Sequence, residues 1–207
     1  MPGTLYIVAT PIGNLEDITL RALRILKEVD LIAAEDTRRT RKLLTHYGIS
    51  TSLTSYFDQD EASKAPLLIE QLKTGKKIAL VTDAGTPGIS DPGHRLVRGA
   101  WEAGLKVVPI PGPSALTALL SCAGLATDRF AFEGFLPAKR GRRVKALEKL
   151  RNEERTLVFF ESARRLIACL EDIRSIFGDR EAAIGREITK IYEEILRGRL
   201  SRLIDSL

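Results

Sequence analysis

The sequence predicts an α/β protein, built on a mostly parallel sheet flanked by helices, and two loops carry that prediction. The run VTDAGTPGISDPG at 81–93 follows an apolar stretch and precedes a helical pattern. A second loop, PIPGPSA at 109–115, again separates a strand pattern from a helix pattern. Glycines let a ligand approach the backbone and prolines hold a loop in one shape. Such loops at the ends of parallel strands are typical of small-ligand sites.

Strand and helix patterns alternate along the first 125 residues, and short apolar runs among them are typical of buried parallel strands. We expect strands at 5–9, 31–34, 52–56, 77–82 and 106–110, and helices at 17–29, 37–46, 61–72, 90–103 and 114–123. The fourth helix is expected to begin at Ser90-Asp91-Pro92, because a capping side chain followed by proline is typical of a helix start.

The composition changes around residues 126–142, and we place a domain boundary there. The N-terminal α/β domain is expected to span 1–125, and a second α/β domain 126–207. Its expected elements are strands at 127–135, 155–160, 181–186 and 190–196, a basic loop at 137–143, and helices up to 150, at 162–177 and at 200–207. Because the chain stops inside an apparent helix, the second domain is expected to be truncated.

Composition and missing motifs exclude several classes of protein. No apolar run approaches membrane-span length and no basic leader precedes the first strand, so we expect a cytoplasmic protein without a membrane partner. His46 and His94 are the only histidines and form no cluster with cysteines, so no metal is expected. GxGxxG, GxxxxGK[ST] and GxSxG motifs are all absent, which disfavours dinucleotide-binding, P-loop and α/β-hydrolase domains. The net charge of +5 favours an anionic partner.

Several motifs, in order along nearly the whole chain, carry a family resemblance. PIGNL at 11–15, AEDTR at 34–38, and the runs 82–93 and 109–115 resemble the tetrapyrrole methylase superfamily of S-adenosyl-L-methionine-dependent methyltransferases. TDRFAFEGFLP at 127–137, Glu161-Ser162 with Arg165, and REITKIYEE at 186–194 are similar to one branch of it. That branch methylates the ribose 2′-hydroxyl of a decoding-centre cytidine in 16S ribosomal RNA. The resemblance also implies a cofactor cleft between the domains, a homodimer, and a substrate within the small ribosomal subunit.

The resemblance assigns the cofactor to the two glycine- and proline-rich loops. S-adenosyl-L-methionine would meet Asp83, Ala84, Gly85 and Thr86 on one side and Pro113, Ser114 and Ala115 on the other. Phe160 and Glu161 would close over the adenine. The residues agree, because Asp83 follows a buried strand and can accept hydrogen bonds, while Ser114 and Ala115 open a helix whose N–H groups can meet a carboxylate. The alternative is that both loops are structural turns.

Catalysis of this reaction needs the proton of a weakly acidic alcohol to be removed while the reactants are held in line. Asp36 is the first candidate for a base or orienting group, and Glu187 and Lys190 in the REITK segment are the alternatives. Asn14 is expected to orient the ribose. The alternative for Asp36 is a helix cap.

Basic residues supply the candidates for RNA binding, namely Arg38, Arg39, Arg140, Arg142, Arg143 and Arg165. They belong to three clusters, and the loop 137–143 is expected to order on RNA. The alternative is that these charges form solvated faces. The family pattern ESPHR reads Glu161-Ser162-Ala163-Arg164-Arg165 here, so a catalytic histidine at that position is absent.

Two other functions stay open at this point. The first is methylation of a corrinoid or porphyrin precursor, which is the commoner chemistry of the superfamily. The second is a ribosome-assembly factor that binds RNA without catalysis, which the altered ESPHR segment and the early stop keep open.

Overall fold

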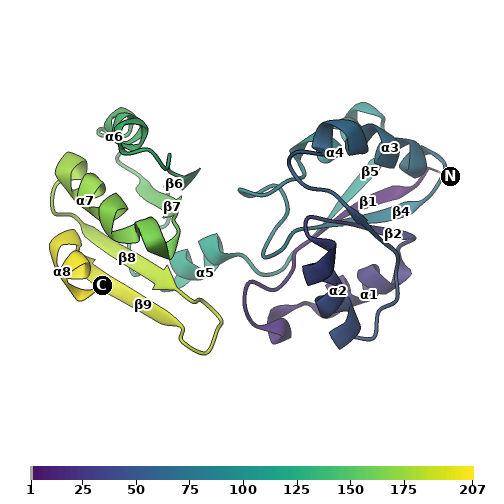
Figure 1. Cartoon of the computed structure of the whole chain (residues 1–207), viewed down its shortest axis with the longest axis horizontal. Coiled ribbons are helices and arrows are strands. Elements are labelled where there is room, and N and C mark those ends of the chain that lie inside the picture. The colour runs from purple at the N-terminus through teal and green to yellow at the C-terminus, as the bar shows by residue number, and fades with distance from the viewer. Residues whose placement is uncertain (1) are drawn as a thin grey trace. The chain divides into compact units, whose positions relative to one another are not determined.

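The computed structural model describes residues 2–207, which fold as two compact units (Figure 1). The first unit runs to Ala115 and the second from Leu116 to Leu207. The division therefore lies ten residues before the sequence-based boundary after residue 125, at the start of helix α5 (Ala115–Cys122). Each unit is described on its own below.

The first unit is a five-stranded parallel sheet with the strand order β3-β2-β4-β1-β5. Its strands are β1 (Thr4–Val8), β2 (Leu31–Ala34), β3 (Leu53–Ser55), β4 (Lys77–Val81) and β5 (Lys106–Ile110). Its helices are the 3-10 turn η1 (Leu15–Asp17), α1 (Leu20–Glu28), α2 (Thr37–His46), α3 (Glu61–Lys73) and α4 (His94–Glu102). These elements confirm the predicted parallel α/β class.

Helices cover both faces of this sheet, because alternate strand residues point to opposite sides. On one face Ala79 and Val81 pack with α1 and α2, and on the other Ile78 and Leu80 pack with α3 and α4. Figure 1 shows the two helix pairs on opposite sides of the strands. A sheet covered in this way presents its loops at the carboxyl ends of the strands as a separate, exposed edge.

Helix α4 begins later than the sequence predicts. Ser90 has a left-handed φ of 64°, which is not the extended backbone of an N-cap residue, so the predicted start at Ser90-Asp91-Pro92 is wrong. The N-cap is Gly93, and its N–H donates to the buried Glu61 carboxylate at 2.6 Å. A side chain from α3 therefore accepts the N–H at the start of α4, where a capping side chain from Ser90 or Asp91 was expected.

The second unit contains a parallel pair of strands and an antiparallel hairpin. Its elements after α5 are β6 (Phe130–Phe135), α6 (Arg140–Lys149), β7 (Thr156–Phe160), η2 (Ala163–Arg165), α7 (Leu166–Phe177), β8 (Glu181–Arg186), β9 (Glu194–Arg199) and α8 (Leu200–Ser206). Strands β6 and β7 pair in parallel around the α6 crossover, while β8 and β9 pair antiparallel. Leu170, Ile184 and Leu203 form part of one apolar core, and Leu136, Leu147 and Cys169 form another.

Two predicted segments of this unit differ from the structure. The segment 137–143, predicted as a basic loop, is helical from Arg140. The N–H groups of Arg142 and Arg143 both donate to the Lys139 carbonyl, and the Arg143 side chain is buried. The last strand is 194–199 rather than 190–196, because residues 187–193 form the hairpin turn. The left-handed φ values of Glu187 and Thr189, 52° and 68°, accompany that turn.

Candidate functional site at the strand ends of the first unit

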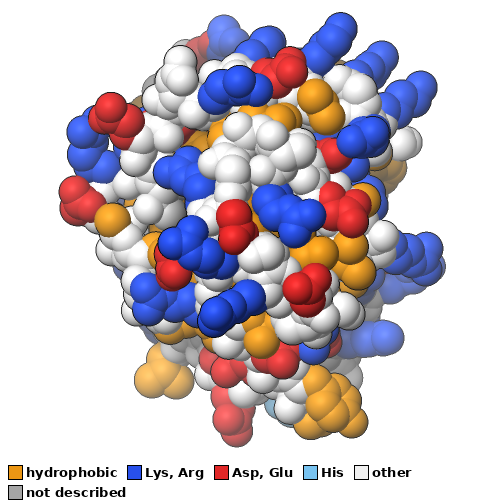
Figure 2. All heavy atoms as spheres, turned by 90° about the vertical axis from the view of Figure 1, so that its left-hand side faces the viewer, with side chains coloured by type: hydrophobic (Ala, Val, Ile, Leu, Met, Phe, Trp, Pro, Cys, Tyr) orange, Lys and Arg blue, Asp and Glu red, His pale blue; other side chains and the backbone are white. Residues whose placement is uncertain are grey.

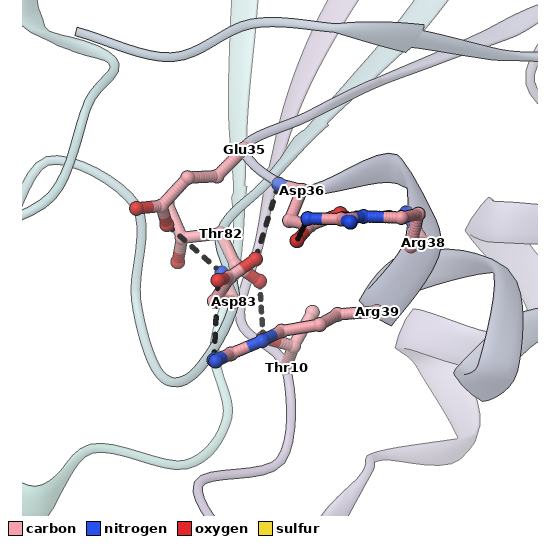
Figure 3. Close-up of polar contacts among 7 residues, drawn as sticks. All are labelled: Thr10, Glu35, Asp36, Arg38, Arg39, Thr82 and Asp83. Carbon is pink, nitrogen blue, oxygen red and sulfur yellow. Dashed lines mark hydrogen bonds and ion pairs between the residues drawn. The ribbon is translucent and has the colours of Figure 1, made fainter.

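Two neighbouring strands of the first sheet end in acidic residues that bind each other's backbone. Glu35 and Asp36 follow β2 directly, and Asp83 lies two residues after the end of β4. The Asp83 N–H donates to Glu35 Oε2 at 3.0 Å, and the Asp36 N–H donates to Asp83 Oδ1 at 3.1 Å (Figure 3). These reciprocal hydrogen bonds fix the start of the loop after β4 against the start of α2.

Further hydrogen bonds hold the same loop from the other side. Gly85 exchanges both backbone hydrogen bonds with Thr10, at 2.9 and 3.0 Å, and the Thr10 hydroxyl donates to the Thr82 carbonyl. The Thr86 hydroxyl donates to the Pro113 carbonyl at 3.3 Å. Loop 83–86 is therefore tied to the residues after β1, β2 and β5, so its backbone groups are held in one arrangement.

Gly85 needs its lack of a side chain in this loop. Its φ is 91°, a conformation that residues with a Cβ rarely adopt. A Cβ placed there would lie 3.5 Å from Ile12 Cγ2 and 3.8 Å from the Pro113 carbonyl oxygen. The glycine thus keeps open a cradle between the first loop, the loop after β4 and the loop after β5.

Asp36 has the geometry of a helix cap. Its carboxylate accepts the N–H of Arg38 at 2.8 Å and also pairs with the Arg38 guanidinium at 3.1 Å. These hydrogen bonds hold the pKa of the Asp36 carboxyl below its usual value, which weakens it as a base. The structure therefore favours capping and orientation over proton abstraction for Asp36.

Glu35 and Asp91 were not among the predicted catalytic or cofactor-binding residues. Their carboxyl groups lie where partial burial disfavours the charged form. Burial is the main cause that raises the pKa of Glu35 above its usual value, and it raises that of Asp91 to about 6. The charges of Asp83 and Asp58 act in the same direction on both. The sequence signal for Glu35 was its place directly after a buried strand, but its partner Asp83 lies 48 positions away.

A small pocket of about 180 Å³ lies beside this acid cluster, between the first loop and α2. Arg39 lines it and pairs with Asp83 Oδ2 at 3.2 Å, and Lys42 lines it from the next turn of α2. Asn14, the predicted ribose-orienting residue, caps η1 by accepting the N–H of Glu16 at 3.1 Å. Arg38 and Arg39, predicted to bind RNA, are thus both paired with carboxylates of the site.

The seven residues predicted to hold the cofactor from the two loops all lie in the first unit, after β4 or β5. Asp83, Ala84, Gly85 and Thr86 form the braced loop described above. Pro113, Ser114 and Ala115 lie between β5 and the start of α5, and Pro113 meets the braced loop through Thr86. The structure thus brings the two predicted loops side by side.

The remaining predicted cofactor and catalytic residues belong to the second unit. Phe160 ends β7, with its ring edge-to-face against Phe132 at 4.9 Å. Glu161 pairs with Arg165 at 2.6 Å and lines a cavity of about 740 Å³ within this unit. Glu187 and Lys190, the alternative catalytic residues, pair with each other at 3.1 Å in the hairpin turn.

One residue predicted to bind RNA is part of the protein interior. Arg143 is 4% exposed, and its guanidinium donates to the equally buried Asp172 at 2.7 and 2.8 Å. The prediction for Arg143 is therefore wrong, because this arginine joins α6 to α7. Arg140 also bonds Asp172, at 3.0 Å, although its side chain is largely exposed. Arg142 is exposed and keeps the predicted access to a partner.

Across residues 2–207, no group of three His, Cys, Asp or Glu side chains gathers where a metal ion would bind. Over the same range, no helix combines the length and the apolar character needed to cross a membrane.

Comparison with known proteins gives matches along nearly the whole chain. A family model described as tetrapyrrole (corrin/porphyrin) methylases matches residues 4–204. A protein of Pasteurella multocida named ribosomal RNA small subunit methyltransferase I is 53% identical over 204 residues, which cover 98% of this chain and 73% of that protein. A protein of the same name from Thermotoga maritima is 51% identical over 202 residues, covering 98% of this chain and 90% of its own length.

Solved structures share the architecture at lower sequence identity. Diphthine synthase superposes with a TM-score of 0.74 at 19% identity, covering 98% of this chain and 84% of that one. Uroporphyrin-III C-methyl transferase from Thermus thermophilus, complexed with S-adenyl homocysteine, gives a TM-score of 0.68 at 20% identity, with 99% and 91% covered. At such identity these likenesses show a common fold.

Proposed function

Because this chain belongs to the tetrapyrrole methylase family, a family of S-adenosyl-L-methionine-dependent methyltransferases, we propose that it methylates small-subunit ribosomal RNA. The group methylated is the ribose 2′-hydroxyl of a decoding-centre cytidine in 16S ribosomal RNA. The observation that supports RNA as the substrate is the 53% identity, over 98% of the chain, to a protein named ribosomal RNA small subunit methyltransferase I. The chain acts as a homodimer in the cytoplasm, on RNA within the small ribosomal subunit.

The residues of the first unit fit the cofactor. The cradle at Gly85 is bordered by Ile12, an apolar side chain, and by the Pro113 carbonyl, a hydrogen-bond acceptor. The braced loop 83–86 adds backbone groups in a fixed arrangement. The Asp83 carboxylate, which also accepts the Asp36 N–H and pairs with Arg39, is the charged group of this loop that could accept hydrogen bonds from amino or ribose groups. Asp83 to Thr86 and Pro113 to Ala115 would hold S-adenosyl-L-methionine.

When bound, the cofactor supplies an activated sulfonium methyl group, so the protein's main task is alignment. Methylation of the ribose 2′-oxygen would also require the hydroxyl proton to pass to a base or to water. In-line positioning supplies much of the acceleration in such a transfer. Asp36 and Asn14 orient the ribose from the first unit, while Glu187 and Lys190 are the remaining candidates for the base.

The decisive experiment is methyl transfer from labelled S-adenosyl-L-methionine to small ribosomal subunits that lack the modification. Nuclease mapping and mass spectrometry then locate the label. We expect a single methyl group on the ribose of the decoding-centre cytidine. Label on a base or on another nucleotide would refute the proposed position. If the ribosomal subunits accept no methyl group and a porphyrin precursor does, the substrate is the precursor and not RNA. If the chain binds the cofactor and methylates neither acceptor, it is an assembly factor.

A further inference from the structure

Three exposed basic side chains lie in a row on helix α6. Arg142, Lys145 and Lys149 follow the spacing i, i+3 and i+7, which places them on one face of the helix. All three are exposed, and none forms an ion pair with any residue among 2–207. Arg143 and Leu147 point the opposite way, into the unit. The row spans about 10 Å, at 1.5 Å per residue, and is called the α6 stripe below.

The start of the helix carries its charges at an energetic disadvantage. Its first turn contains Arg140, Arg142 and Arg143 and no acidic residue, and Lys139 makes no side-chain cap. Cations at this end oppose the helix macrodipole, whereas Lys149 in the last turn is favourably placed. Glu148 is the only acid between residues 139 and 151, against seven lysines and arginines. An anionic partner along the helix would relieve this imbalance.

The chemistry of the surroundings selects the kind of anion. No large apolar side chain is exposed on α6, so the face lacks the hydrophobic contact that an interfacial membrane helix needs. The stripe also lacks an aromatic side chain on which a base could stack. What remains is a row of point charges, suited to the regularly spaced phosphates of a nucleic-acid strand. Figure 2 shows Lys and Arg side chains projecting along the upper edge of this end of the molecule.

We propose that the α6 stripe binds the phosphate backbone of the RNA substrate, while Arg140 and Arg143 hold the helix in place through Asp172. This inference rests on the proposed function, because RNA is the substrate assigned there. It differs from the sequence-based assignment in separating the arginines of the cluster by role. The stripe positions the RNA without reading its sequence, since backbone contacts carry no base identity.

The test compares two triple variants with the same change in net charge. The stripe variant is Arg142→Gln with Lys145→Gln and Lys149→Gln, since glutamine keeps helix propensity. The control variant is Arg21→Gln with Lys27→Gln and Lys106→Gln, which replaces exposed cations of the first unit. Binding to an oligoribonucleotide of the decoding-centre sequence is measured by fluorescence anisotropy across a salt series. Cofactor binding is measured by calorimetry.

Removing three phosphate contacts should reduce the slope of log affinity against log salt by about 2 for a single strand. The same arithmetic predicts about a hundredfold weaker binding at 0.1 M salt for the stripe variant. The control should keep the wild-type slope, and both variants should keep the wild-type cofactor affinity.

Each remaining outcome contradicts a stated part of the inference. An unchanged slope in the stripe variant, or an equal loss in both variants, would overturn the stripe while leaving RNA as the substrate. A wild-type chain that binds neither this oligoribonucleotide nor small ribosomal subunits, yet binds the cofactor, would overturn the stripe and the proposed RNA substrate together.

Discussion

The ion pair between Arg143 and Asp172 gives the sharpest test of how the second unit is held together. The two side chains are only 5% and 3% exposed. Two guanidinium nitrogens of Arg143 donate to the Asp172 carboxylate, at 2.7 and 2.8 Å. Replacing Asp172 by alanine leaves a guanidinium buried without its partner. Breaking a buried pair in this way costs about 3–5 kcal/mol.

The matched control is Arg140→Ala, which removes the other cation on the same carboxylate. Its side chain is 78% exposed, so solvent replaces much of what the ion pair contributed, and the loss should stay below about 1 kcal/mol. The double replacement Arg143→Met with Asp172→Leu removes both charges at once. It should recover most of the stability lost in Asp172→Ala, since no charge is left unpaired.

Hydrogen exchange of the α6 and α7 amides in the whole chain measures the local effect. A cost of 3 kcal/mol or more corresponds to exchange at least about a hundredfold faster, because each 1.4 kcal/mol is a factor of ten. Equal effects of Asp172→Ala and Arg140→Ala would refute the reasoning. So would a double variant no better protected than Asp172→Ala.

Three further predictions concern the first unit. Asp83→Ala should weaken S-adenosyl-L-methionine binding by at least about tenfold in calorimetry, the size of one lost charged hydrogen bond; unchanged affinity would remove Asp83 from the cofactor site. Gly85→Ala should cost about 1–2 kcal/mol in thermal unfolding, because alanine is strained at a φ of 91°, and an unshifted melting temperature would contradict that. Burial raises the pKa of Asp91 from 3.8 to about 6, so the folded chain binds the extra proton in that window and stability falls as pH rises through it. Asp91→Asn should flatten this dependence in urea titrations from pH 4 to 7, and an identical profile would count against a raised pKa at the partly buried Asp91.

Where local pattern decides the structure, the sequence was sufficient. Leu31–Ala34 and Thr37–His46 form β2 and α2 with the predicted ends, since an apolar run, the capping side chain of Asp36 and Gly48 after the helix are all local signals. The loops 83–86 and 113–115 follow β4 and β5 as predicted for the same reason. The apolar strands determine where each loop begins, and the glycine and proline residues determine which backbone conformations each loop can adopt.

Where a distant residue decides the structure, the sequence was not sufficient. Glu61 accepts the N–H at the start of α4 across 32 positions, and no local pattern announces that contact. The Glu35–Asp83 pairing depends on β2 lying beside β4, which is a property of strand order. Arg143 belongs to a basic run whose members look alike, and only the orientation of α6 against Asp172 sets it apart.

The acids of the first unit serve mainly to build the site. Glu35 and Asp83 each accept a backbone N–H from the other's strand end, and Asp36 caps the helix that follows. The lowered pKa of Asp36 argues against this carboxyl as the base that removes the proton. Transfer of a methyl group that is already activated places its demand on distance and alignment. A rigid loop braced by carboxylates meets that demand, which explains why the strand ends are acidic although the proposed RNA partner is an anion.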